Sequence, residues 1–366
     1  MANTKLRGIF FMLAVSFVLS DRFVGGRSID TMEGKELAKH KGTVKTIEGK
    51  NGDMIDCVDI YQQPAFDHPL LKDHIIQMEP NSIPKLTNKL YDTEMFHGWL
   101  EDGQCPEGTI PIRHVREGEC HAHRTVPPLS RRKDLNFNED SETKGHEYAT
   151  ADLDHGDFYG THAIINIWQP VTLSGDFSLA QIWITAGPPE ELNTIEVGWH
   201  VASGKVKPQF FIYWTRDAFQ KTGCYNLDCA GFVQDVGITV HKAQGKWWLQ
   251  FDDKVVGYWP ESIFTHIASK ADTLSFGGEV FDKLQNGHHT STDMGSGHFA
   301  EEGYGKASYF RNIQYVDANG KFNDVGQQLR PYVTKTSCYD ISIDGGNGGN
   351  GTGFYFGGPG YSEQCP

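Results

Sequence analysis

The sequence predicts an all-β fold of the sandwich or barrel kind, and three observations support this prediction. Aromatic residues make up 12% of the 366 residues, and they favour strands. Glycine is frequent, with 41 residues, which suits a fold with many turns. Short apolar or alternating runs recur from His146 onward, and Gly, Pro, Asn and Asp separate them at near-regular spacing.

The predicted strands follow one another through the second part of the chain, and each is rich in β-branched or aromatic residues. They are expected at 163–168, 178–186, 194–201, 209–214, 237–241, 246–251, 254–259, 273–281 and 307–316, with a short FYF strand in the glycine-rich tail 345–360. One helical segment is expected among them. Pro260 opens it, and Ile263 and Ile267 share a face, so one or two helical turns are predicted over 260–270.

The first residues have the pattern of a secretory signal. Lys5 and Arg7 precede an apolar run over 9–19, and small residues follow through Gly26. The run is too short to cross a bilayer as a helix. The sequence therefore predicts a signal peptide over 1–26 and a secreted protein with no membrane partner.

The part of the chain between the signal and His146 differs in residue pattern from the part that follows. Residues 33–50 are predicted to form a short basic helix or a linker. Residues 128–145 are polar and charged, which predicts an exposed and cleavable linker. The RRK run at 131–133 fits a protease site and fits an ordinary solvated loop equally well.

The net charge of the chain indicates which class of partner it is suited to bind. The chain has 33 Lys and Arg against 47 Asp and Glu, a formal net charge of −14. This argues against a nucleic-acid partner, because phosphate binding needs a basic face. Many carboxylates suit a surface that works in acid, where protonation relieves their repulsion. An ordinary acidic protein explains the charge equally well.

The seven cysteines are expected in an oxidising environment. Grouping by region pairs Cys57 with Cys105, Cys224 with Cys229, and Cys338 with Cys365, although spacing alone does not prove these pairs. Cys120 is left over. Asn350 begins the sequon Asn-Gly-Thr, a glycosylation site expected on the surface.

Common catalytic and metal motifs are weak. Ser296 lies between glycines, but the GxSxG pattern of a nucleophile elbow is absent. The histidines at 288, 289 and 298 lack the spacing of a metal-binding motif, which favours surface histidines near a turn. No CxxC occurs. No metal and no cofactor are therefore expected.

Two glutamates stand out because of their place in predicted strands. Side chains alternate between the two faces of a strand. Glu196 then shares a face with Gly198, and Glu279 shares a face with Gly277, so each carboxyl has a small neighbour. Glycine within a strand often marks close approach by a ligand or another backbone. The pattern alone favours two solvent-facing glutamates on the outer face of a sheet.

A family resemblance covers nearly the whole chain. DCVDIYQQPAFDHPLLKDH at 56–74 and CPEGTIPIR at 105–113 resemble the activation segment of the neprosin family of plant secreted proteins. TIEVGWHV, TGCYNLDC, FGGEV, MGSGHFAEEGYGKASYFRNIQ and FGGPG resemble its peptidase domain, in the same order. The two catalytic glutamates of the family lie in the motifs TIEVGW and FGGEV, which here contain Glu196 and Glu279.

The resemblance implies an antiparallel β-sandwich of two packed sheets, related to fungal glutamic peptidases and preceded by a smaller N-terminal pro-domain. It also implies an inhibitory prosegment over 27–145 and a peptidase domain over 146–366. The expected partners are a peptide or protein substrate and the chain's own prosegment, and the expected state is a monomer. The location that the resemblance implies is an acidic extracellular compartment or the apoplast.

The resemblance further implies a mechanism. Two glutamates that face one cleft share a proton, because close like charges keep one carboxyl protonated. Glu279 is expected to be the general base that activates water. Glu196 is expected to be the acid that stabilises the oxyanion. A preference for proline is also implied, and Trp183, Trp199 and Trp214 are candidates for stacking on its ring, although tryptophan in a sandwich is more often core.

The chain departs from the family in two places, and rival functions remain open. Between Gln234 and Trp247 it lacks residues that relatives use for another hairpin, which would open a sheet edge or reshape the cleft. Phe276 replaces the usual tryptophan before GGE. An inactive β-sandwich module that binds cell-wall glycan or protein is the main alternative. Paired carboxylates also serve glycoside hydrolases.

Overall fold

The computed structural model describes residues 39–49, 54–81, 105–114, 145–202, 207–237, 240–251, 254–283, 288–345 and 351–366. The predicted signal peptide, most of the predicted linker, Cys120 and Asn350 lie outside these residues. All the described residues belong to one compact unit, residues 38–366. No helix among them has the length and apolar character needed to span a membrane.

The first described part forms a small antiparallel sheet. Its order is β1 (Thr43–Glu48), β2 (Met54–Asp59) and β3 (Thr109–Arg113). The prediction of a basic helix or linker over 33–50 is therefore wrong for β1, because Thr46 and its neighbours pair with β2 around Asp56. A disulfide joins Cys57 to Cys105. Three short 3₁₀ turns follow β2, at Ile60–Gln62 (η1), Pro64–Asp67 (η2) and Pro69–Leu71 (η3).

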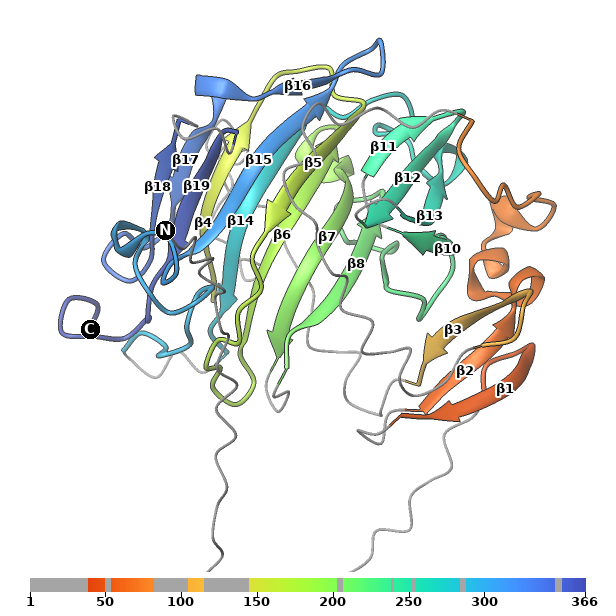
Figure 1. The fold of residues 1–366 in the computed structure, drawn as a ribbon, viewed down its shortest axis with the longest axis horizontal. Coiled ribbons are helices and arrows are strands. Elements are labelled where there is room, and N and C mark those ends of the chain that lie inside the picture. Colours follow the sequence, from red (N-terminus) through yellow and green to blue (C-terminus); the bar gives the residue numbers. More distant parts are fainter. Residues whose placement is uncertain are drawn as a thin grey trace, which may run out of the picture. The chain divides into compact units, whose positions relative to one another are not determined.

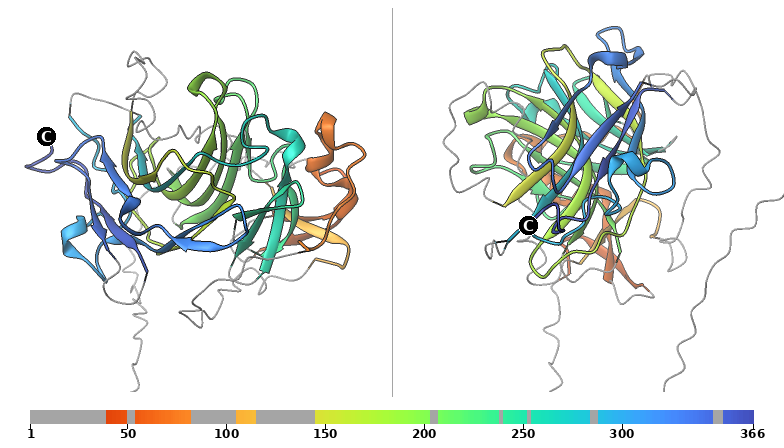
Figure 2. Two further views of the ribbon diagram at one scale, coloured as in Figure 1. Left: turned by 90° about the horizontal axis from the view of Figure 1, so that it is seen from above. Right: turned by 90° about the vertical axis from the view of Figure 1, so that its left-hand side faces the viewer.

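Two larger antiparallel sheets form the rest of the described chain (Figure 1). The seven-stranded sheet has the order β17 (Arg330–Val333), β4 (His146–Leu153), β14 (Thr273–Phe281), β6 (Phe177–Ala186), β7 (Asn193–Ala202), β8 (Gln209–Thr215), β9 (Cys224–Tyr225). Most of its long strands match the predicted runs. The two sheets are seen from other sides in Figure 2.

The nine-stranded sheet begins at the edge strand β10. Its order is β10 (Val233–Gly237), β13 (Lys254–Pro260), β12 (Lys246–Phe251), β11 (Val240–Ala243), β5 (Gly160–Ile165), β15 (Ser308–Val316), β19 (Gly353–Gly357), β18 (Asp340–Asp344), with β16 (Phe322–Asp324) paired to β15. The shortened segment between Gln234 and Trp247 lies in this sheet. The strands that carry Glu196 and Glu279 belong to the other one.

The main apolar core lies between the two large sheets and confirms the predicted β-sandwich. Alternate residues of the seven-stranded sheet, among them Val197, Trp199 and Phe276, belong to one cluster with Trp247 and Phe310 of the nine-stranded sheet. All of these side chains are buried. Phe276 therefore fills an aromatic position in the core, where its ring lies 6.1 Å from that of Phe310 in an edge-on arrangement.

The predicted helical turns over 260–270 are reduced to one 3₁₀ turn, Glu261–Ile263 (η7). The side-chain oxygen of Asn193 accepts hydrogen bonds from the backbone N–H groups of Thr265 and His266, both at 2.9 Å. Because this amide satisfies the donors, the backbone does not need helical carbonyls as acceptors. The other described 3₁₀ turns are η6 (Pro189–Glu191), η8 (Ala300–Glu302) and η9 (Gly326–Gln328).

Candidate active site

The second face of the seven-stranded sheet points away from the inter-sheet core and carries its own buried cluster. The cluster comes from alternate residues of β4, β6, β7 and β8, together with Phe219. Its buried members are Tyr148, Phe177, Leu179, Trp183, Ala202, Phe211, Tyr213 and Phe219. Glu196 and Glu279 lie on this same face, and each has an exposed fraction of 0%. We call this surface the glutamate face.

The strand register sets the places of the two glutamates. Glu279 on β14 pairs with Leu179 on β6, and Glu196 on β7 pairs with Trp183 on β6. Gln181 lies between these two positions on the same face of β6, because side chains alternate along a strand. The two carboxyl groups therefore flank the amide of Gln181, which donates a hydrogen bond to Glu196 over 3.2 Å.

Glycines flank Gln181 on both sides of β6. Gly277 of β14 and Gly198 of β7 both pair with Gln181. A Cβ atom at Gly198 would lie 2.1 Å from the carbonyl oxygen of Ala180, and one at Gly277 would lie 2.2 Å from that of Ala149. Such contacts are too short, so only glycine fits these positions. Each glutamate has a glycine two positions away on its own face, and the register places both glycines in one row.

Two described hydrogen-bond contacts of Glu279 come from β4. Its carboxylate Oε1 lies 2.6 Å from Nδ1 of His146, and the Tyr148 hydroxyl donates to the same oxygen over 3.4 Å. His146 is 7% exposed, and its ring lies 4.7 Å from that of Phe281. Sequence reasoning did not select His146, because only the β4–β14 register brings it to Glu279, 133 residues away.

The described contacts of Glu196 are neutral. The Thr194 hydroxyl donates to Oε1 over 2.9 Å, and the Gln181 amide donates to Oε2. Neutral donors of this kind tolerate a carboxyl in either protonation state. The two glutamates therefore differ in their described hydrogen bonds, which come from an imidazole and a hydroxyl at Glu279 and from a hydroxyl and an amide at Glu196. This difference suits a pair in which one carboxyl is a base and the other an acid.

Of the three tryptophans considered for proline, only Trp183 lies on the glutamate face. Trp199 and Trp214 belong to the inter-sheet core, so these two candidates are wrong. Stacked aromatic pairs lie elsewhere on the glutamate face. The ring of Tyr213 lies 5.7 Å from that of Phe219, and Phe211 and Tyr225 stack at the same distance.

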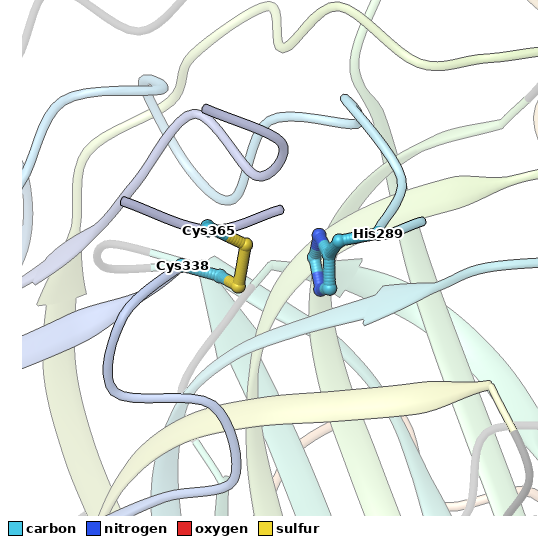
Figure 3. A group of neighbouring side chains, drawn as sticks. All are labelled: His289, Cys338 and Cys365. Carbon is cyan, nitrogen blue, oxygen red and sulfur yellow. A yellow bond between two sulfur atoms is a disulfide. The ribbon is translucent and has the colours of Figure 1, made fainter. Parts of the chain in front are cut away.

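The histidines noted in the sequence do not form one cluster. His298 is exposed and pairs with Glu302 at 2.9 Å, whereas His289 is buried and its Nε2 lies 2.7 Å from Glu147. The expectation of surface histidines is therefore wrong for His289. His289 also lies beside Cys338 and Cys365, whose sulfur atoms are bonded to each other (Figure 3). A disulfide offers no thiolate, so this group is a poor metal site.

The structure also bears on the predicted disulfide pairs and on Ser296. A third disulfide joins Cys224 to Cys229, so the structure forms the three pairs expected from the grouping by region. The Ser296 hydroxyl accepts a hydrogen bond from the backbone N–H of His298, which is a local turn contact.

A second polar group lies in the small N-terminal sheet. Asp56 is buried and hydrogen-bonds to Nδ1 of His40 at 3.1 Å, to Nε2 of His114 at 2.5 Å and to the Thr46 hydroxyl at 2.7 Å. Burial alone would raise the pKa of Asp56. The hydrogen bonds from the His40 backbone, Thr46 and the two imidazoles outweigh it and hold this pKa well below its ordinary value. These residues are far apart in sequence, which explains why no motif revealed them.

Residues 63–77 pack against the edge of the nine-stranded sheet. Ala65 belongs to a buried cluster with Val233, Trp248 and Tyr258, and Leu71 is wholly buried in the same cluster as the inter-sheet core. We call residues 63–77 the docking segment.

Polar contacts hold the docking segment in place. The backbone N–H of Gln234 on β10 donates to the Gln63 side chain over 2.9 Å, and Nε2 of His74 lies 2.8 Å from the Tyr258 hydroxyl. The edge that the sequence predicted to be opened by the short 234–247 segment is therefore in contact with the docking segment.

Comparisons with known proteins agree with this organisation. The family model described as neprosin matches residues 174–240 and 235–359. The model described as neprosin activation peptide matches residues 46–152. Two crystal structures of scytalido-glutamic peptidase, one with a peptide-based transition-state analogue and one with a transition-state analogue inhibitor, are 12% identical in sequence. Each match covers 57% of this chain and 97% of the other, with TM-scores of 0.36 and 0.34.

Proposed function

This chain belongs to the neprosin family, and from that membership we propose that it is a secreted glutamic endopeptidase, made as a zymogen and active in acid. The observation that carries the proposal is the position of Glu196 and Glu279 on one face of one sheet, both buried and both hydrogen-bonded. The activation segment contains the docking segment, and it serves as an intramolecular inhibitor until it is removed.

The proposed reaction uses the two carboxyl groups in different roles. Glu279, ionised, takes a proton from water while the water oxygen bonds to the carbonyl carbon of the peptide. Glu196, protonated, donates a hydrogen bond to the carbonyl oxygen as negative charge develops on it. When the C–N bond breaks, the proton held by Glu279 passes to the leaving nitrogen. No covalent intermediate with the enzyme is needed.

We propose a preference for proline on weaker grounds. The glutamate face holds the indole of Trp183 and the stacked pair Tyr213 and Phe219. Flat aromatic surfaces suit the rigid pyrrolidine ring. The strand register pairs both Trp183 and Tyr213 with Glu196, which supports a proline site on that side of the face.

The function is tested with the full chain after acid treatment. Its cleavage of a fluorogenic peptide that contains proline is compared with cleavage of the same peptide with alanine in its place. A glycan panel is tested in parallel. Cleavage of the proline peptide in acid supports the proposal. Glycan binding without any cleavage favours the inactive binding module, and glycan hydrolysis favours a glycoside hydrolase; either result contradicts the proposal.

Acid is expected to release the docking segment partly through His74. Burial, and secondarily the positive charge of Lys246, lowers the pKa of His74 below its ordinary value of 6.5. The docked state thus favours the neutral imidazole. The stabilisation of the docked state that depends on neutral His74 is complete above pH 6.5 and is lost as the pH falls through the lowered pKa. We expect His74→Gln, which cannot take up a proton, to need a more acid pH for maturation, by a few tenths of a pH unit. Maturation is followed by gel electrophoresis against pH.

His155→Asn is the matched control, because His155 is exposed and lies outside the docking segment. Its maturation should follow the wild-type pH curve. An unchanged curve for His74→Gln would exclude His74 as an acid trigger.

A further inference from the structure

His146 is the closest described polar neighbour of Glu279. It precedes Tyr148 on β4, and the pairing of His146 with Phe281 and of Tyr148 with Glu279 places both side chains on the glutamate face. The imidazole lies among the rings of Phe281, Phe177 and Tyr148, at centroid distances of 4.7, 5.9 and 6.5 Å. These rings limit its movement, so Nδ1 is held toward the Glu279 carboxyl.

The chemistry of this pair depends on pH in a specific way. An imidazole that carries two protons is a cation, and in that state His146 faces Glu279 as a positive charge over 2.6 Å. Apolar surroundings such as Leu179 and Phe177 disfavour a carboxylate, whereas an adjacent cation favours it. A general base has to be ionised at the working pH. A base that operates in acid therefore needs a partner that offsets its burial.

Other described ionisable groups lie on the elements around this pair. On β4, Tyr148 is a neutral donor and Glu147 pairs with His289 instead. On β7, His200 pairs across the sheet with Leu179, and its Nε2 lies 2.6 Å from the Tyr225 hydroxyl. Glu196 lies four residues from His200 on the same strand and would add only negative charge. After β14, Asp282 is also acidic.

We infer that His146 is a positioning residue that keeps Glu279 ionised in acid, as a general base has to be. This inference rests on the proposed peptidase function and extends it with a residue outside the two glutamates. His146 acts through Glu279 and takes no part in bond making.

The test compares kcat and KM of matured wild type, His146→Gln and His146→Lys on the proline peptide from about pH 2.5 to pH 7. Glutamine keeps a hydrogen-bond donor but no charge. We expect its acid limb of kcat to move to higher pH by about one unit or more, with KM little changed. Lysine restores a cation, and its acid limb should lie closer to wild type. The control His298→Gln removes an exposed histidine that pairs with Glu302, and its profile should match wild type.

The outcomes separate this inference from the proposed function. A His146→Gln enzyme that is slower by the same factor at every pH, with an unmoved acid limb, overturns the inference and leaves the function intact. Full activity of Glu279→Gln overturns the function itself. If thermal melting shows that His146→Gln does not fold, His146→Lys is the variant that tests the inference. An acid limb displaced by about one pH unit or more, despite the retained cation, contradicts the inference. An acid limb near that of wild type supports it.

Discussion

Glu279→Gln is expected to lose about 100- to 10,000-fold in kcat for peptide cleavage in acid, the range in which a general base contributes. The substitution preserves the size of the side chain and removes its ability to take a proton. Glu196→Gln should lose activity on the same scale, because its protonated form supplies the proposed oxyanion contact. Hydrolysis of the proline peptide by the matured variants gives both rates.

Two measurements make this result interpretable. Thermal melting of both variants should stay near wild type, because glutamine keeps the size of the side chain. At position 196 its carbonyl oxygen can accept from Gln181, and its NH2 group can donate to the Thr194 hydroxyl, which is also an acceptor. Glu302→Gln is the matched control, since Glu302 lies in an exposed turn with His298 and Lys306. Near-normal turnover by Glu196→Gln or Glu279→Gln would remove that residue from the mechanism.

Leu71→Ala is expected to weaken the docking segment strongly. Leu71 is wholly buried in the cluster that includes the inter-sheet core. Truncation of a buried leucine costs about 2–5 kcal/mol through lost burial and the cavity left behind. Inhibition should therefore be lost at a less acid pH, and the intact chain should begin to cleave the proline peptide at that pH. The onset of cleavage is measured as the pH is lowered stepwise.

The neighbouring residue supplies a close control. Leu70 has the same side chain, lies in the same 3₁₀ turn and is 55% exposed. Leu70→Ala should leave the onset pH unchanged. Equal behaviour of the two variants would mean that burial of Leu71 does not contribute to inhibition.

Strand positions and faces were predictable from the sequence because alternation is a local property. The run at 194–201 correctly separates Glu196 from Val197 and Trp199, which enter the inter-sheet core. The run at 273–281 separates Glu279 from Phe276 in the same way. Over 260–270 one turn formed, the 3₁₀ turn at Glu261–Ile263, and it goes no further because a distant side chain, Asn193, satisfies the backbone N–H groups that follow.

The surroundings of the two glutamates could not be predicted, because they depend on the register between strands far apart in sequence. His146 reaches Glu279 only through the β4–β14 pairing, and Gln181 comes between the glutamates only through β6. The contacts of Asp56 with His40 and His114 likewise join separate segments. The alternation of side chains along a strand predicts which face of the sheet a residue occupies. Its neighbours on other strands follow only from the register in which the strands pair.

The Cys57–Cys105 disulfide constrains how the N-terminal part can be shed. It links residues 48 positions apart, and the docking segment lies inside that loop. A single protease cut between the two cysteines would leave both fragments covalently tethered, so the nicked protein would keep its inhibitor. Liberation of the peptidase therefore requires backbone scission on the C-terminal side of Cys105, and one cut there discards the whole inhibitor as a single piece.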